Sequence, residues 1–163
     1  MKISSLKLIM ILSLCIPLTA IAADVKSIII IDYGIFKANV IKSSHSGTAA
    51  AGPSNLKNPA QIQQTDEIPA LLGTRFGFHF FINGSPRNEN VNLLFRVVSP
   101  PLKSPDEKEI SSQEVLLKSK IGAKGYADYA FDDTWELVPG KWVLQLLYEG
   151  KVMAEKSFTI NEQ

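Results

Sequence analysis

The sequence predicts an all-β fold, an antiparallel β-sandwich of the immunoglobulin type that is held together without a disulfide. Short segments that alternate apolar and polar residues recur along the chain, separated by turn residues, which is typical of such sandwiches. No amphipathic helix longer than two turns follows residue 22. The 163 residues, 45% of them hydrophobic, suffice for one domain, and a single cysteine excludes a disulfide framework. A small β-barrel is the alternative.

Residues 1–22 have the pattern of a cleavable signal peptide. Lys2 and Lys7 accompany the apolar run Leu8–Ile16, and Ala20–Ala22 supplies the small residues that a signal peptidase requires. The run is shorter than the about 20 apolar residues that cross a bilayer as a helix. We therefore expect the mature chain to begin at Ala23 and to reside in the periplasm or outside the cell.

The mature chain, residues 23–163, is expected to form one domain without a transmembrane segment. Two of the 17 basic residues lie in the first 22, so 15 basic and 16 acidic residues remain. This balance provides no basic field for nucleic acid. Within the domain, residues 38–59 lack apolar periodicity and are rich in Ser, Gly and Pro, which predicts a long mobile loop.

The first half of the domain contains three strand patterns and one weaker one. Ser27–Lys37 holds four consecutive isoleucines, whose β-branched side chains favour a strand. Gln61–Ile68 alternates weakly up to Pro69. Arg75–Asn83 and Val91–Val98 alternate clearly and are expected to be adjacent strands. Pro100 and Pro101 are expected to end the latter strand, and Leu102–Ser112 to form a polar loop.

The second half ends in the strongest local signal. Gln113–Ile121 fits a strand or one helical turn, and Gly125–Phe131 fits a strand. The Pro139-Gly140 pair predicts a turn. Trp142–Tyr148 and Val152–Ile160 then each place apolar residues on one face, with a reversal at Glu149-Gly150, so a C-terminal β-hairpin is expected. Trp142 is expected in the core, and Lys156 is the one polar residue on the apolar face.

Three strings in order carry a family likeness: Ile31–Phe36, Ile68–Phe78 and Tyr129–Trp142, the last containing Trp-Glu-Leu-Val-Pro-Gly-Lys-Trp. With them the chain resembles the bacterial family catalogued as domain of unknown function 3859, over nearly the whole mature chain. The resemblance implies a compact exported domain and no assigned activity.

Candidate binding residues lie on the predicted strands. His79 shares a strand face with Phe81 and Asn83. Together with Tyr129, His79 and Phe81 are the surface residues that we expect a ligand to contact, although a hydrogen-bonded strand histidine is the plainer explanation of His79.

Asp132, Asp133 and Glu136 form the densest acidic group and are weak candidates for a hard cation. Their spacing does not match a calcium loop. No other potential metal ligands lie close together in the sequence, and no cofactor is expected.

These observations favour a non-enzymatic exported binding or structural module of the bacterial cell envelope, with an envelope protein or polymer as its partner. The mature chain contains no cysteine, no Gly-x-Ser-x-Gly motif and no phosphate-binding loop. The alternative is a periplasmic enzyme whose site assembles from scattered polar residues.

Overall fold

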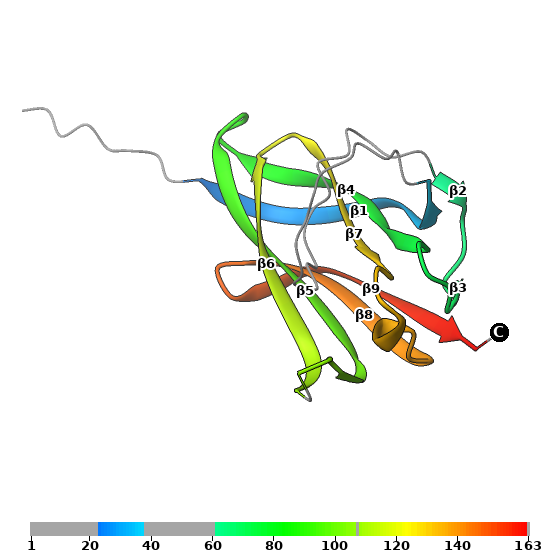
Figure 1. The fold of residues 1–163 in the computed structure, drawn as a ribbon. Coiled ribbons are helices and arrows are strands. Elements are labelled where there is room, and N and C mark those ends of the chain that lie inside the picture. The colour runs from blue at the N-terminus through cyan, green and yellow to red at the C-terminus, as the bar shows by residue number, and fades with distance from the viewer. Residues whose placement is uncertain (1–22, 38–60, 107, 163) are drawn as a thin grey trace, which may run out of the picture.

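The computed structural model describes residues 23–37, 61–106 and 108–162. In these ranges two β-sheets pack face to face, as Figure 1 shows. The predicted β-sandwich is confirmed, and the barrel alternative is wrong because the two sheets are not closed into one. The predicted signal peptide and the predicted loop at 38–59 lie outside the described residues. No helix in the described ranges is long and apolar enough to cross a membrane.

Nine strands and one short helix make up the described fold. The four-stranded sheet has the order β2-β1-β4-β7, with bounds β1 (Asp24–Phe36), β2 (Gln61–Gln63), β4 (Arg75–Ser85) and β7 (Lys124–Ala130). The five-stranded sheet has the order β3-β9-β8-β5-β6, with bounds β3 (Glu67–Pro69), β5 (Asn90–Lys103), β6 (Glu109–Lys120), β8 (Gly140–Tyr148) and β9 (Lys151–Asn161). The 3-10 helix η1 (Thr134–Glu136) precedes β8.

Aromatic side chains from both sheets fill the core. Phe76 of β4 lies edge-on to Trp142 of β8 and to Phe158 of β9, with ring centroids 6.2 and 5.2 Å away. All three are fully buried, as are Phe78, Phe80 and Phe95. Burying one such side chain stabilises the fold by roughly 1.5–3 kcal/mol. The predicted core position of Trp142 is therefore confirmed.

The expectation that the strands at 75–83 and 91–98 are neighbours is wrong. β4 pairs with β1 and β7, whereas β5 pairs with β6 and β8 in the other sheet. Each strand has one apolar face, and such strands bury that face equally well side by side or across the core. Alternation alone cannot distinguish these two arrangements, so only the tertiary structure separates the strands.

The expectation of a polar loop at 102–112 is also wrong. β5 continues through Pro100 and Pro101, and its register against β6 shifts between Val98 and Leu102. The irregularity accommodates the two prolines, which lack the N–H group of a regular ladder. Beyond it Leu102 lies opposite Ile110 and is fully buried. The segment 113–121, left open between strand and helical turn, belongs mainly to strand β6.

The C-terminal hairpin of β8 and β9 is confirmed. Its two turn residues, Glu149 and Gly150, have φ values of 49° and 78°, as a two-residue type I′ turn requires. The expected inward position of Val152 is wrong, because the register shifts between Leu146 and Leu147 and leaves Val152 exposed. Lys156 does face inward, with its Nζ 3.6 Å from the centroid of the Tyr33 ring.

The weak pattern at 61–68 splits between the sheets. β2 pairs with β1 in one sheet, and β3 pairs with β9 in the other. The β3–β9 pair is parallel, so the sandwich is antiparallel except at this edge. Pro69 is itself the last residue of β3, so the strand includes this proline and does not end before it.

Candidate functional site

The outer face of the four-stranded sheet carries a group of polar and aromatic side chains that we call the outer-face cluster. Alternation along β4 directs Phe76, Phe78 and Phe80 into the core and Arg75 and His79 to the other face. The cluster comprises Asp32 and Phe36 of β1, Arg75 and His79 of β4, and Tyr126 and Asp128 of β7.

Asp32 and His79 form the polar centre of this cluster. Asp32 lies opposite His79 across the β1–β4 pair, after a register shift between Ile30 and Asp32 that directs the carboxylate outward. The Nδ1 atom of His79 lies 2.5 Å from Oδ1 of Asp32, and their side chains are 12% and 31% exposed. A carboxylate at Nδ1 orients the imidazole and leaves Nε2 for another contact. That Nε2 is buried, and no described residue forms a hydrogen bond with it.

The rings of Phe36 and Tyr126 pack against the His79 ring of this pair. The ring centroids of Phe36, His79 and Tyr126 are separated from one another by 5.0 to 5.2 Å. Beside them Gly34 lies opposite Gly77. A Cβ atom at Gly77 would stand 2.1 Å from the carbonyl oxygen of Ala127, so β4 and β7 approach closely only because this residue has no side chain.

A buried ion pair joins Arg75 to Asp128 at the other end of the cluster. The Asp128 side chain is completely buried and the Arg75 side chain is 18% exposed. Burial raises the pKa of the neighbouring Tyr126 hydroxyl far above its usual value, and the charge of Asp128 raises it further. Tyr126 therefore stays neutral at any physiological pH and does not act as a base.

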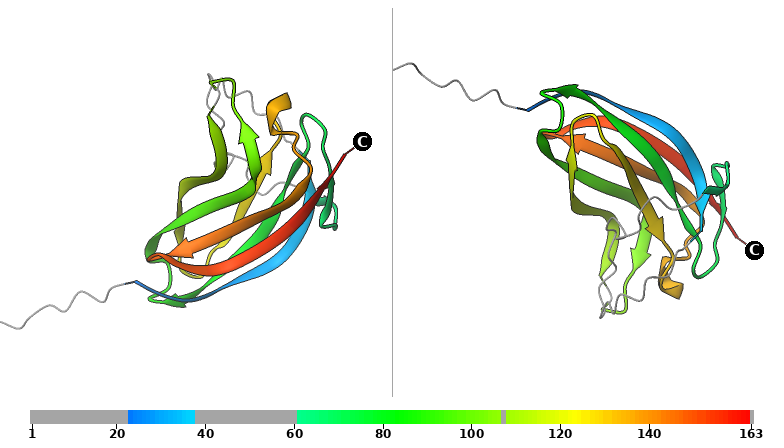
Figure 2. Two further views of the ribbon diagram at one scale, coloured as in Figure 1. Left: turned by 90° about the horizontal axis from the view of Figure 1, so that it is seen from below. Right: turned by 90° about the horizontal axis from the view of Figure 1, so that it is seen from above.

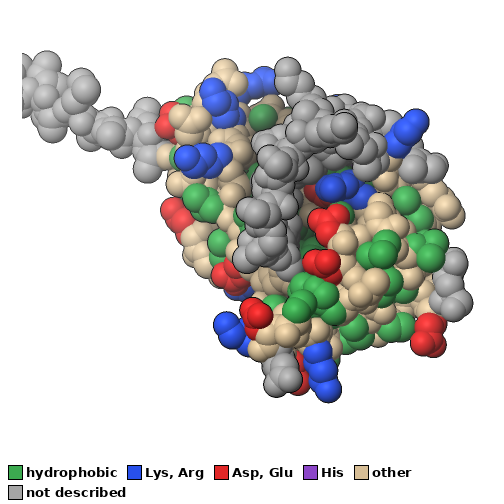
Figure 3. All heavy atoms as spheres, in the orientation of Figure 1, with side chains coloured by type: hydrophobic (Ala, Val, Ile, Leu, Met, Phe, Trp, Pro, Cys, Tyr) green, Lys and Arg blue, Asp and Glu red, His purple; other side chains and the backbone are tan. Residues whose placement is uncertain are grey.

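An apolar strip, consisting of the exposed Ile29 and Ile31 and the half-buried Phe81, adjoins the cluster. Ile29 lies opposite Phe81 across the β1–β4 pair, two residues from the Asp32–His79 pair along β4. Ile29 is 51% exposed and Ile31 is 45% exposed. Figure 3 shows acidic and basic side chains scattered over the face it presents, without a large area of one sign. The outer surface of β1 and β4 therefore carries the apolar strip next to the Asp32–His79 pair.

Of the predicted surface residues, His79 and Phe81 do lie on the outer face, and Tyr129 does not. Tyr129 is buried in the core between Phe76 and Trp142. The phase of alternation in β7 directs Ala127 and Tyr129 inward and Tyr126 outward. The expectation that Tyr129 contacts a ligand is therefore wrong.

The acidic group at 132–136 has a structural role instead of a cation-binding one. Glu136 is buried, and its carboxylate accepts hydrogen bonds from the hydroxyl of Tyr129 at 2.6 Å and from the backbone N–H groups of Asp132 and Asp133 at 2.8 and 3.0 Å. Its oxygen atoms are thus already used. Asp132 and Asp133 are exposed, and the described residues contain no group of three potential metal ligands from His, Cys, Asp and Glu.

Three charged members of the cluster were missed from the sequence: Asp32, Arg75 and Asp128. Asp32 had a local signal, because it interrupts an otherwise apolar run of isoleucines. Asp128 and Arg75 had none, since 53 residues separate the partners of this ion pair.

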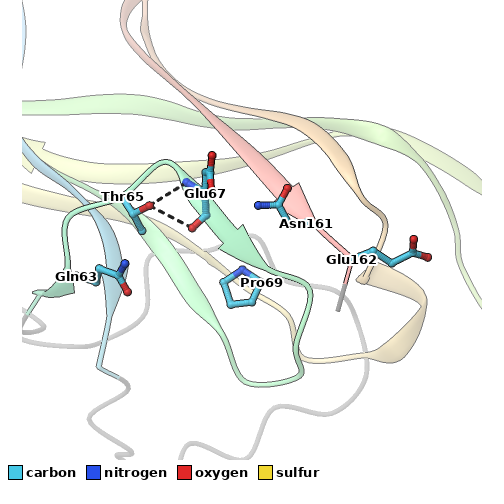
Figure 4. Close-up of a pocket in the computed structure, with 6 residues that line it drawn as sticks. All are labelled: Gln63, Thr65, Glu67, Pro69, Asn161 and Glu162. Atoms are coloured by element: carbon cyan, nitrogen blue, oxygen red, sulfur yellow. Dashed lines mark hydrogen bonds between the residues drawn. The ribbon is translucent and has the colours of Figure 1, made fainter.

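A separate shallow depression of about 250 Å³ lies at the β3–β9 edge (Figure 4). Its lining residues are Gln63, Thr65, Glu67, Pro69, Asn161 and Glu162. The Thr65 hydroxyl accepts a hydrogen bond from the Glu67 N–H at 3.1 Å, so it stabilises its own turn. The depression opens to solvent and brings together no reactive groups.

The two packed sheets define an immunoglobulin-like β-sandwich domain, and the cluster lies on the outer face of one of them. An immunoglobulin-like protein from Pseudomonas aeruginosa superimposes on 86% of the chain and 97% of its own length, with a TM-score of 0.60 and 26% identity. The chain belongs to the family described as Domain of unknown function (DUF3859), which matches residues 25–160, so the resemblance in the sequence is confirmed.

Two other comparisons add little. A DNA-bound alkylpurine DNA glycosylase from Pseudomonas fluorescens is similar over 59% of this chain and 28% of its own, with 15% identity and a TM-score of 0.41, which supports no inference about function. Among curated proteins, none matches the chain.

Proposed function

We propose that the chain is a non-enzymatic binding module of the bacterial cell envelope, exported by the pattern at residues 1–22, and that it recognises a protein through the outer face of its four-stranded sheet. An immunoglobulin-like domain of a family without assigned activity is compatible with a binding module. Fold alone does not specify function, which depends on the residues at the surface.

The exposed apolar strip carries the proposal. A strand face in water normally bears polar residues, yet Ile29 and Ile31 are about half exposed beside Phe81. Covering the exposed part of one isoleucine would contribute on the order of 1 kcal/mol to binding. Such a strip suits a protein partner, because the buried centre of a protein–protein interface is more apolar than the rest of the surface and is enriched in aromatic residues.

The Asp32–His79 pair lies at the border of the strip and is consistent with the same binding surface. Polar groups at the rim of an apolar contact set its orientation and contribute less to its affinity. The carboxylate and the imidazole already bind each other at 2.5 Å, so a partner meets a fixed polar feature and not two mobile side chains.

In-cell photo-crosslinking tests this surface. A photo-reactive residue at the exposed Asn83, beside the strip, would be introduced into the full chain with and without Ile31→Lys. We expect a discrete crosslinked protein that Ile31→Lys abolishes. Val152→Lys is the matched control, because Val152 is similarly exposed, at 40%, on the other sheet. Equal crosslinking in the wild type and Ile31→Lys would contradict the proposal.

Export is tested separately. Fractionation and intact-mass measurement should find a chain that begins at Ala23, with Asp24 as the second choice. A cytoplasmic chain that retains its first 22 residues would contradict the envelope location without bearing on the binding surface.

A second candidate function is an enzyme that uses Asp32 and His79. A carboxylate-oriented imidazole with a free Nε2 is the arrangement of a general base. This candidate predicts that the protein hydrolyses acyl esters, and that His79→Gln and Asp32→Asn abolish hydrolysis with the melting temperature retained. The buried position of Nε2 makes it the weaker candidate.

A further inference from the structure

The outer edge of β6 is the longest unpaired strand edge in the described part of the chain. β6 has 12 residues and ends the five-stranded sheet, and among the described strands it pairs only with β5. Figures 1 and 2 show this strand, in yellow-green, at one border of the sandwich. Such an edge presents free N–H and C=O groups that can pair with another strand.

The two faces of β6 differ in chemistry. Leu117 lies opposite the core residue Leu93, and Val115 lies opposite the core residue Phe95, so these two side chains face inward. The intervening residues face outward and are exposed: Ser112, Glu114, Leu116, Lys118 and Lys120. Leu116 is 54% exposed between a carboxylate and an ammonium group.

This sequence is complementary to itself in one antiparallel register. When Leu116 lies opposite its own copy, Glu114 lies opposite Lys118 of the second copy on the outer face. On the inner face Val115 then lies opposite Leu117 of the second copy. Acidic, basic and apolar positions all match.

The neighbouring registers match less well. Regular antiparallel pairing allows only shifts that keep the same face together. Centring on Val115 places Glu114 opposite Leu116, and centring on Glu114 places two carboxylates together. Centring on Leu117 pairs Glu114 with Lys120 but places each Leu116 opposite Lys118, so an apolar side chain meets a charge twice. The strand thus specifies the register centred on Leu116.

We propose that two copies of the chain pair edge to edge through β6, antiparallel and centred on Leu116, so that their five-stranded sheets become one continuous sheet. Such a contact is a two-fold symmetric interface, the commonest kind in homo-oligomers. Glu114 already accepts a hydrogen bond from Nε of Arg96 at 2.6 Å. Its side chain remains 41% exposed, so Lys118 of the second copy can join the pair.

The opposite interpretation is that Lys118 and Lys120 protect the edge, since lysines on edge strands commonly prevent pairing. It predicts a monomer at every concentration. Sedimentation velocity of the protein purified after expression of the full chain distinguishes the two. We expect a reversible monomer–dimer equilibrium, with a dissociation constant on the order of micromolar for so small an interface. A monomer throughout the micromolar range overturns the proposal.

Charge exchange tests the register. Lys118→Glu sets two carboxylates opposite each other at each of the two symmetric 114–118 positions of the dimer, and Glu114→Lys sets two cations there, so each should raise the dissociation constant by about tenfold or more. The double variant should restore dimerisation, and a mixture of the two single variants should form a heterodimer. Lys151→Glu, on the far hairpin, is the matched control and should change nothing. A dimer that neither single variant weakens overturns the proposed register and interface.

Discussion

Replacing Glu136 should reveal how much one buried carboxylate stabilises the end of β7 and the turn that follows. In the structure its two oxygens accept three hydrogen bonds, of 2.6, 2.8 and 3.0 Å, from Tyr129, Asp132 and Asp133. Glu136→Ala leaves these three donors without their acceptor. A buried donor left unpaired costs about 1–3 kcal/mol, and the partly buried backbone groups regain some of it from water. We therefore expect Glu136→Ala to lower the free energy of unfolding by about 3–5 kcal/mol. This is a large share of the about 5–15 kcal/mol that a native protein usually has.

Glu136→Gln separates the hydrogen bonds from the charge. The carboxamide oxygen can accept from both backbone N–H groups, and its NH₂ group can donate to the Tyr129 hydroxyl, which accepts as well as donates. All three hydrogen bonds then survive without the charge. We therefore expect Glu136→Gln to lower the free energy of unfolding by only about 1 kcal/mol.

Urea denaturation followed by tryptophan fluorescence measures these differences, since Trp135 and Trp142 lie close to the site. A cycle with Tyr129→Phe isolates the Tyr129–Glu136 contact. The hydrogen bonds of Glu136 do not stabilise this turn if Glu136→Ala lowers the free energy of unfolding by less than about 1 kcal/mol, or if Glu136→Gln lowers it as much as Glu136→Ala does. Stabilisation of the wild type by calcium, absent in Glu136→Ala, would restore the cation-binding role.

Three further predictions follow from the core and the sheet. Trp142→Ala should lose about 3–5 kcal/mol in denaturant unfolding, because Trp142 is fully buried and its Nε1 donates to the carbonyl of Val138 at 3.0 Å; an unchanged midpoint would contradict its core position. Burial raises the pKa values of Tyr126 and Tyr129 above the ordinary 10.0, so the folded state retains protons that the unfolded state releases. Stability should be constant below about pH 10 and fall above it, with tyrosinate absorbance rising cooperatively with unfolding; gradual ionisation of all tyrosines in an intact fold would refute this. Gly77→Ala should lower stability by about 1–3 kcal/mol by forcing β4 and β7 apart, and a melting temperature equal to that of the wild type would show that the strands tolerate the extra carbon.

The candidate site could be predicted only in part. Alternation around His79 correctly placed it and Phe81 on one outer face, because side-chain direction in a strand depends on neighbouring residues alone. The same reasoning failed for Tyr129, since the pattern in 125–131 is too irregular to define its phase. The partner of His79 lies 47 residues away at Asp32, and only strand pairing brings them together.

The sequence by itself determined the fold class, the C-terminal hairpin and the core position of Trp142, because each depends on local periodicity or on a turn such as Glu149-Gly150. The tertiary structure alone decided that β4 and β5 face each other across the core, that the chain from 61 to 69 divides between the sheets, and that β5 continues past Pro100. The physical reason is the same in each case. An apolar strand face must be buried, but whether a neighbour in the sheet or the opposite sheet buries it depends on contacts between segments far apart in the chain.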